Sequence, residues 1–142
     1  MQSALQNASK VNERNMTPEM AWFGCGIQQA IREDKQATSD FLALLFAKML
    51  HRMNEDHPWV SEEDAMEEGE DMMACDPTWT IEDFALAMSK MAKGGLSAHN
   101  GRPSTGWVRK CQIAYNELKY EAREELARKA KATAEADAAE RA

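Results

Sequence analysis

The side chains best suited to metal binding or nucleophilic catalysis are few and widely separated in this chain. Its three cysteines are Cys25, Cys75 and Cys111, and no two of them form a C-x-x-C pair. His51 and His57 stand six residues apart, without the spacing of a metal-binding helix. We therefore expect no metal, no cofactor and no disulfide framework. Isolated cysteines of this kind favour a reducing, cytoplasmic setting.

Local motifs for nucleotide or calcium binding are incomplete. The segment 24–26 resembles the opening of a dinucleotide-binding fingerprint, but Gln29 stands where the third glycine is needed. The acidic run from Asp64 places Gly69 correctly for an EF-hand, yet its third and twelfth positions lack an oxygen ligand. No nucleophile is matched to a base by a local signature. The sequence therefore predicts a protein that is not an enzyme.

Charge is distributed unevenly, and it defines two candidate surfaces. The net charge is −7, yet residues 51–89 carry twelve acidic residues against Arg52 alone, and residues 90–119 carry six basic residues against Glu117. This asymmetry predicts an acidic partner-binding surface and a separate basic surface for phosphates, although both sets could simply solvate helix faces. The acidic candidates are Glu62, Glu63, Asp64, Glu67, Glu68, Glu70 and Asp71. The nucleic-acid-binding candidates are Lys93, Arg102, Arg109 and Lys110, with Trp107 available to stack.

The composition favours a single all-α domain. The chain has 142 residues, enough for one ordinary core, and its apolar residues are mainly Ala, Leu and ten Met. We expect a flexible arm over residues 1–16, a helical domain over 17–120 and a charged, Ala-rich helical tail over 121–142. The predicted fold is a compact bundle of about five helices, with a mobile N-terminal arm and a projecting C-terminal helix.

Capping signals and apolar periodicity place these five helices. Thr17 suits an N-cap and Pro18 a first helical position, and the segments 61–64 and 80–83 match the capping box. The run 41–50 is apolar nearly all round, which predicts the most buried helix. The first helix should run from Pro18 to about Arg32, and the second from Thr38 or Ser39 to a point before His57. The third should run from Ser61 to about Cys75 and the fourth from Thr80 to about Lys93. The last should start at Ser104 or Thr105.

The apolar stripes of three helices predict one core. Its expected members are Phe41, Leu44, Leu45, Phe84, Met88, Trp107, Cys111 and Tyr115. The methionines fill such a core readily. Because thioether side chains repack with little strain, they could also line an adaptable groove for a partner helix.

Three segments between residues 79 and 118 carry a family resemblance. They are the helix opening WTIEDFALAMSKMAKGG, the loop NGRPS and the next helix start GWVRKCQIAYNE. This part of the chain resembles a group of small, mostly uncharacterised helical proteins from prophages and other mobile elements of Bacteroidetes-type bacteria. Positions that match the pattern of this group are Glu82-Asp83-Phe84, Lys93-Gly94, Arg102 and Trp107-Val108. Aromatic residues expected in the loop are replaced here by Leu96, Ser97 and Asn100.

The resemblance and the charge pattern lead to different functions. The resemblance implies a non-catalytic accessory or adaptor protein of a phage or mobile element, associated with DNA replication and acting through protein contacts near DNA. The acidic segment favours the alternative, a regulator or nucleic-acid mimic that binds a basic partner. An enzyme with dispersed residues is a third hypothesis. We expect a cytoplasmic protein with no membrane association, because no secretory signal or membrane-length apolar run is present, and homo-oligomerisation stays open.

Overall fold

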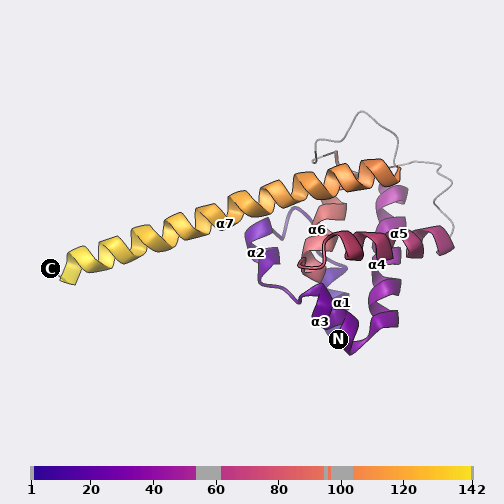
Figure 1. The fold of residues 1–142 in the computed structure, drawn as a ribbon, viewed down its shortest axis with the longest axis horizontal. Helices are drawn as coiled ribbons and strands as arrows, with labels where there is room; N and C mark the ends of the chain where they lie inside the picture. Colours follow the sequence, from indigo (N-terminus) through magenta and orange to yellow (C-terminus); the bar gives the residue numbers. More distant parts are fainter. Residues whose placement is uncertain (1, 54–61, 95, 97–103, 142) are drawn as a thin grey trace.

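The computed structural model describes residues 2–53, 62–94, 96 and 104–141. Within these ranges the chain forms seven α-helices and one isolated antiparallel bridge between Gly26 and Thr80 (Figure 1). The helices are α1 (Gln2–Ala8), α2 (Pro18–Trp22), α3 (Ile27–Glu33), α4 (Lys35–Arg52), α5 (Glu62–Cys75), α6 (Ile81–Ala92) and α7 (Thr105–Arg141). The all-α prediction is confirmed. No helix in the described part of the chain is long and apolar enough to cross a membrane.

Helix α4 is the central element of the fold. It packs against α3, α5 and α6, and its Leu42, Phe46 and Leu50 side chains are fully buried, which confirms the predicted core helix. The Asp34 side chain accepts a hydrogen bond from the Ala37 amide at 3.0 Å. Because this cap lies upstream of the expected one, α4 begins at Lys35 rather than at Thr38 or Ser39.

One predicted core residue lies on the surface. The Leu44 side chain is 62 % exposed, so its assignment to the core is wrong, whereas the other seven members are buried. Positions 41, 42, 45, 46, 49 and 50 of α4 are all buried. Position 44 falls between these rows, on the same outer side as Asp40 and Lys48, because residues four apart share a helix face. The charged residues Asp40 and Lys48 were the signal in the sequence that position 44 faces water, and the apolar residues around Leu44 obscured it.

The first predicted helix is two helices in the structure, so the prediction of one helix over residues 18–32 is wrong. Thr17 does cap α2, since its Oγ1 accepts from the Met20 amide at 3.3 Å. The break comes at segment 24–26, which pairs with the strand-like segment before α6. There the amide of Ile81 donates to the Cys25 carbonyl at 2.8 Å. This long-range pairing replaces the helical hydrogen bonds that a continuous helix would make.

The segment before α2 is not a separate arm. Helix α1 packs against α4 and α6, and its Leu5 and Ala8 side chains are buried. Glu13 then forms ion pairs with Lys90 at 3.2 Å and with Lys93 at 3.7 Å. The prediction of a flexible arm over residues 1–16 is therefore wrong for the described residues 2–16. Residues 2–16 contain too few apolar positions for a helical periodicity to be recognised. The packing of α1 against α4 and α6 therefore could not be predicted from the sequence.

Helix α7 has 37 residues, and only its first half belongs to the domain. It begins where predicted, with Ser104 Oγ accepting from the Trp107 amide at 3.1 Å. Residues 127–141 are all exposed, and Figure 1 shows this end extending away from the other helices. The predicted projecting C-terminal helix is confirmed. We call residues 127–141 the projecting helix.

Candidate functional site

One face of α7 carries a row of polar side chains that bind three carboxylates from α5, α6 and the turn between them. The α7 members are Thr105, Arg109, Gln112, Asn116 and Lys119, and the carboxylates are Glu68, Asp76 and Asp83. Spacings of three and four residues place the α7 members on one helix face. We call these eight residues the polar seam. Next to it runs the apolar stripe Trp107, Cys111 and Tyr115, which is buried in the core.

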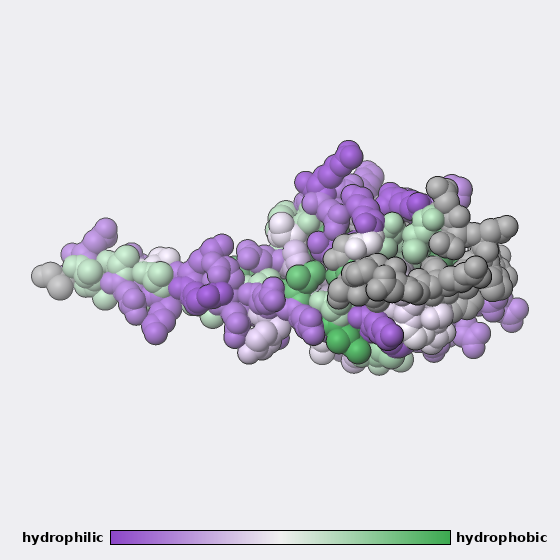
Figure 2. Space-filling model, turned by 90° about the horizontal axis from the view of Figure 1, so that it is seen from above, coloured by the Kyte–Doolittle hydropathy of each residue, from purple (hydrophilic) through white to green (hydrophobic). Residues whose placement is uncertain are grey.

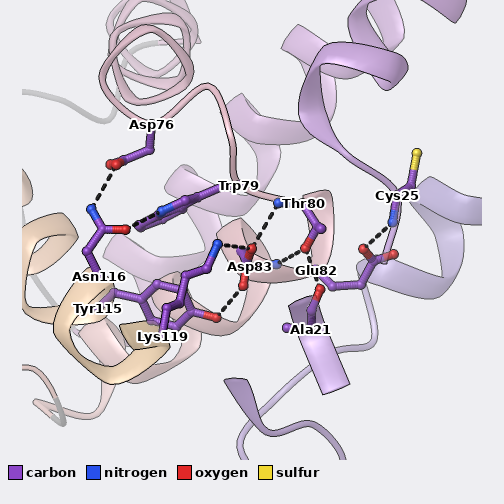
Figure 3. A network of polar contacts seen from close by, with 10 residues as sticks. All are labelled: Ala21, Cys25, Asp76, Trp79, Thr80, Glu82, Asp83, Tyr115, Asn116 and Lys119. Carbon is purple, nitrogen blue, oxygen red and sulfur yellow. Dashed lines mark hydrogen bonds and ion pairs between the residues drawn. The ribbon is translucent and has the colours of Figure 1, made fainter. Parts of the chain in front are cut away.

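At the inner end of the polar seam, Asp83 is fully buried and has several donors (Figure 3). Its Oδ1 accepts from the Tyr115 hydroxyl at 2.8 Å, and its Oδ2 accepts from the Thr80 amide at 2.9 Å and from Lys119 Nζ at 2.7 Å. Thr80 Oγ1 accepts from the Asp83 amide, which completes the predicted capping box, and donates to the Ala21 carbonyl at 2.6 Å. Burial and the Asp83 charge raise the pKa of Tyr115.

The middle of the polar seam satisfies a buried indole. Trp79 is fully buried, and its Nε1–H donates to Asn116 Oδ1 at 2.7 Å (Figure 3). The Asn116 amide donates in turn to Asp76 Oδ1 at 2.8 Å, while Gln112 Nε2 donates to Asp76 Oδ2 at 2.6 Å. The Trp79 ring also packs edge-on against Tyr115, with centroids 4.8 Å apart. Asn116 and Gln112 therefore link α7 to Trp79 and Asp76.

The outer end of the polar seam joins two residues that the sequence assigned to different binding surfaces. Glu68 is buried, and its Oε1 accepts from Arg109 Nη2 at 2.8 Å. Thr105 Oγ1 donates to the other oxygen of Glu68 at 3.3 Å, and Arg109 also donates to Gln112. Burial raises the pKa of Glu68, and the Arg109 charge opposes that rise. The predicted acidic surface thus loses Glu68 to this pair, and the predicted nucleic-acid surface loses Arg109.

The structure does not assemble the predicted nucleic-acid surface. Trp107 is 8 % exposed and packs in the core, so the prediction that it is available to stack on a base is wrong. Lys93 is paired with Glu13, and Arg109 with Glu68. Arg102 lies outside the described residues. Among the described members of this set, Lys110 alone is exposed without an ion pair.

The predicted acidic surface is largely present on α5, which contains no basic residue. Its exposed members, which we call the acidic face, are Glu63, Asp64, Glu67, Glu70 and Asp71. Glu68 is the exception, because it turns inward to Arg109. The side chain of Glu62 lies outside the described residues.

Gly69 lets α5 lie close to α4, since a Cβ there would sit 3.2 Å from the Leu42 Cβ.

The polar seam holds the first part of α7 against α5 and α6. Its carboxylates accept hydrogen bonds from α7, and burial raises the pKa of the neighbouring Cys111 thiol to about 11. Within the described residues, no group of three or more His, Cys, Asp or Glu side chains could hold a metal ion. The sequence analysis did not predict the polar seam, although the sequence contains one indication of it. Polar residues at positions 105, 109, 112, 116 and 119 repeat at helical spacing beside the apolar stripe.

Comparisons with protein family models, with curated proteins and with solved structures find no match to this chain. A function is therefore inferred from the surfaces that the fold presents. Two of them stand out among the described residues: the acidic face of α5 and the projecting helix.

Proposed function

We propose that this chain is a non-catalytic accessory or adaptor protein that works through protein contacts. The observation that carries the proposal is the projecting helix, which extends about 22 Å beyond the domain at 1.5 Å per residue (Figure 1). The polar seam fixes the root of the same helix, so the exposed end has a defined direction. A surface of this kind suits recognition by another protein.

The composition of the projecting helix indicates how a partner would bind it. Residues 127–141 combine four basic and three acidic residues with many alanines. Figure 2 shows a mainly hydrophilic surface there, interrupted by weakly hydrophobic patches. Alanine favours the helix, and Arg128 pairs with Glu125 at 3.0 Å, one turn away. The partner contacts should therefore be largely electrostatic and sensitive to salt.

The resemblance of residues 79–118 supports a place among accessory proteins of a phage or mobile element, with a role associated with DNA replication. Direct DNA contact would be a minor part of this role. With Lys110 as the described candidate that is exposed and unpaired, we expect weak binding. Each neutralised phosphate contributes about −0.9 to the log–log salt slope on duplex DNA, so the slope should be shallow.

A pull-down from the native host tests the adaptor function. Full-length chain and a chain ending at residue 126 serve as parallel baits. We expect proteins encoded by the same mobile element to be retained by the full-length bait and lost with the shortened one. Recovery of the same proteins by both baits, or of metabolic enzymes alone, would contradict the proposal.

The acidic face favours a second candidate, a regulator that binds a basic partner in the manner of a nucleic-acid mimic. The triple variant Glu63→Gln/Glu67→Gln/Glu70→Gln removes three exposed charges from α5. A basic protein recovered with the wild-type bait should bind this variant more weakly, and its wild-type affinity should fall as salt rises. A control variant with Glu117, Glu121 and Glu124 changed to Gln removes three exposed charges from α7 outside the projecting helix. Equal weakening in both variants would exclude a specific role for the acidic face.

A further inference from the structure

The segment formed by residues 2–16, called here the N-terminal segment, lies against a groove between α4 and α6. Helix α1 contacts both helices, and Ser9 and Val11 face their side chains. The floor of this α4–α6 groove is formed by Leu45, Met49, Ala85, Met88 and Ser89. Lys48 and Arg52 of α4 line its basic rim. Lys90 of α6 and Lys93, which directly follows α6, continue this rim where they pair with Glu13 of the segment.

The N-terminal segment fills this groove imperfectly. Between the segment and the groove lies a cavity of about 20 Å³, bordered by Val11 on one side and Met88 on the other. The Ser89 hydroxyl borders the same cavity, is buried, and has no hydrogen-bond partner among the described residues. The N-terminal segment therefore leaves a gap at this point of the groove.

The charges of the N-terminal segment also match the groove poorly. Glu13 pairs with Lys90 and Lys93, whereas Lys48 and Arg52, which line the groove, have no ion pair with the described residues of the segment. The segment itself carries Lys10 and Arg14 against Glu13. A net positive segment therefore lies beside a positive rim. An acidic helix would have the complementary charge.

We propose that the α4–α6 groove is a docking site for an acidic amphipathic helix of a partner protein, which takes the place of the N-terminal segment. This rests on the proposed adaptor function and specifies the chemistry of the partner. The partner helix would present apolar side chains three residues apart, in the places that Leu5 and Ala8 now occupy, and its carboxylates would face the basic rim. Met49 and Met88 in the floor adjust to its apolar side chains, because thioethers repack easily.

Peptide binding to the full-length chain tests this site. The first probe is a fluorescein-labelled peptide of residues 2–16, and the second is the same peptide with Lys10→Glu and Arg14→Glu. Binding is measured by fluorescence anisotropy to wild type and to the full-length Leu5→Glu variant, which weakens the internal contact. We expect the acidic peptide to bind Leu5→Glu about tenfold more tightly than wild type, because an internal competitor lowers apparent affinity. It should also bind more tightly than the first probe, and less tightly at high salt.

Two charge-reversal variants separate the rim from general electrostatics. In the Leu5→Glu background, Lys90→Glu/Lys93→Glu should lower the affinity for the acidic peptide by about tenfold. The matched control is Lys110→Glu/Lys131→Glu, which reverses two exposed lysines on α7. It should leave the affinity unchanged within about twofold. Circular dichroism checks that each variant retains its helices.

Hydrogen exchange on the unmodified chain gives an independent test. Amides of residues 4–8 should exchange at least about a hundredfold faster than those of residues 42–50, since displacement requires the segment to open locally. Equal protection of the two regions would overturn the proposal. So would failure of both peptides to bind Leu5→Glu, or an affinity indifferent to Lys90→Glu/Lys93→Glu. A wild-type chain that is dimeric and whose N-terminal amides are protected from exchange would also overturn the proposal, because a second copy of the chain would then occupy the groove. The pull-down tests the adaptor function separately, so failure of the docking site and failure of the adaptor function can be distinguished.

Discussion

Asp83 illustrates how one buried carboxylate connects three parts of this fold. It completes the N-terminal cap of α6 through Thr80, and it accepts hydrogen bonds from Tyr115 and Lys119 of α7. Thr80 continues the connection to α2 through the Ala21 carbonyl. Sequence inspection identified the cap, because it depends on residues three apart. It could not identify Tyr115 and Lys119 as partners, because they are more than thirty residues away.

Replacing Lys119 with methionine should destabilise the protein substantially. The Lys119 side chain is 12 % exposed and its Nζ lies 2.7 Å from Asp83, so the substitution leaves a buried carboxylate without its cation. Removing one partner of a buried ion pair costs about 3–5 kcal/mol of unfolding free energy. Urea unfolding monitored by circular dichroism measures the loss. Lys110→Met on the exposed side of the same helix is the control, and a comparable loss there would point to helix propensity instead.

The pH dependence of stability should reveal Glu82. Its Oε2 accepts from the Cys25 amide at 2.9 Å, and burial raises its pKa above the ordinary value of 4.5. The folded chain therefore keeps this proton at pH values where the unfolded chain has lost it. The Glu82 contribution to the unfolding free energy must then decrease as pH rises from 4.5 through the raised pKa. The difference between wild type and Glu82→Gln should fall across that window. A difference that grew with pH would mean that the folded-state pKa is lowered.

The three cysteines should react in a fixed order with iodoacetamide. Cys75 is exposed, Cys25 is partly buried with a raised pKa, and Cys111 is buried with its pKa raised to about 11. Because the thiolate is the reactive form, Cys75 should be alkylated first and Cys111 only after unfolding. Peptide mass spectrometry at successive times gives the order. Early labelling of Cys111 in the folded chain would show that α7 separates from the core.

At the scale of elements, α4 offers a matched pair of substitutions. Leu42 is fully buried against α5, while Leu44 is 62 % exposed on the same helix. Leu42→Ala should therefore cost about 2–5 kcal/mol of unfolding free energy. Leu44→Ala should change it by no more than about 0.5 kcal/mol. Thermal and urea unfolding of both variants provide the comparison, and similar values for the two would mean that α4 is rotated from the orientation described.

Element boundaries were predictable wherever local chemistry determines them. Thr17 and Thr80 cap their helices as expected, and α5 ends at Cys75 as predicted. The failures share a different cause. The break between α2 and α3 depends on pairing with residues 79–81, and the burial of α1 depends on the groove beneath it. Neither partner is near in sequence. The polar seam eluded prediction for the same reason, since each hydrogen bond from α7 to its three carboxylates spans more than thirty residues.

For the molecule as a whole, the domain should be independent of the projecting helix. Every residue from 127 to 141 is exposed, so this segment buries little apolar area against the domain. A chain ending at residue 126 should keep its unfolding free energy within about 0.5 kcal/mol of wild type and lose helical signal in proportion to the residues removed. Urea unfolding at two protein concentrations measures both quantities. A concentration-dependent loss on truncation would show that the segment joins copies of the chain.

The continuity of α7 has a mechanical consequence. Arg123 lies over the Trp22 ring of α2, 4.6 Å from its centroid, four residues beyond Lys119. From Arg123 to Arg141 the helix extends about 27 Å, and from Thr105 to Arg123 it also spans about 27 Å. A sideways force at the tip therefore acts through a lever arm about as long as the part that resists it. The torque loads the Arg123–Trp22 and Lys119–Asp83 contacts before the Arg109–Glu68 contact, because the first two lie nearer the tip. Trp22 belongs to α2 and Asp83 caps α6, so a force on the tip reaches two elements of the domain at once.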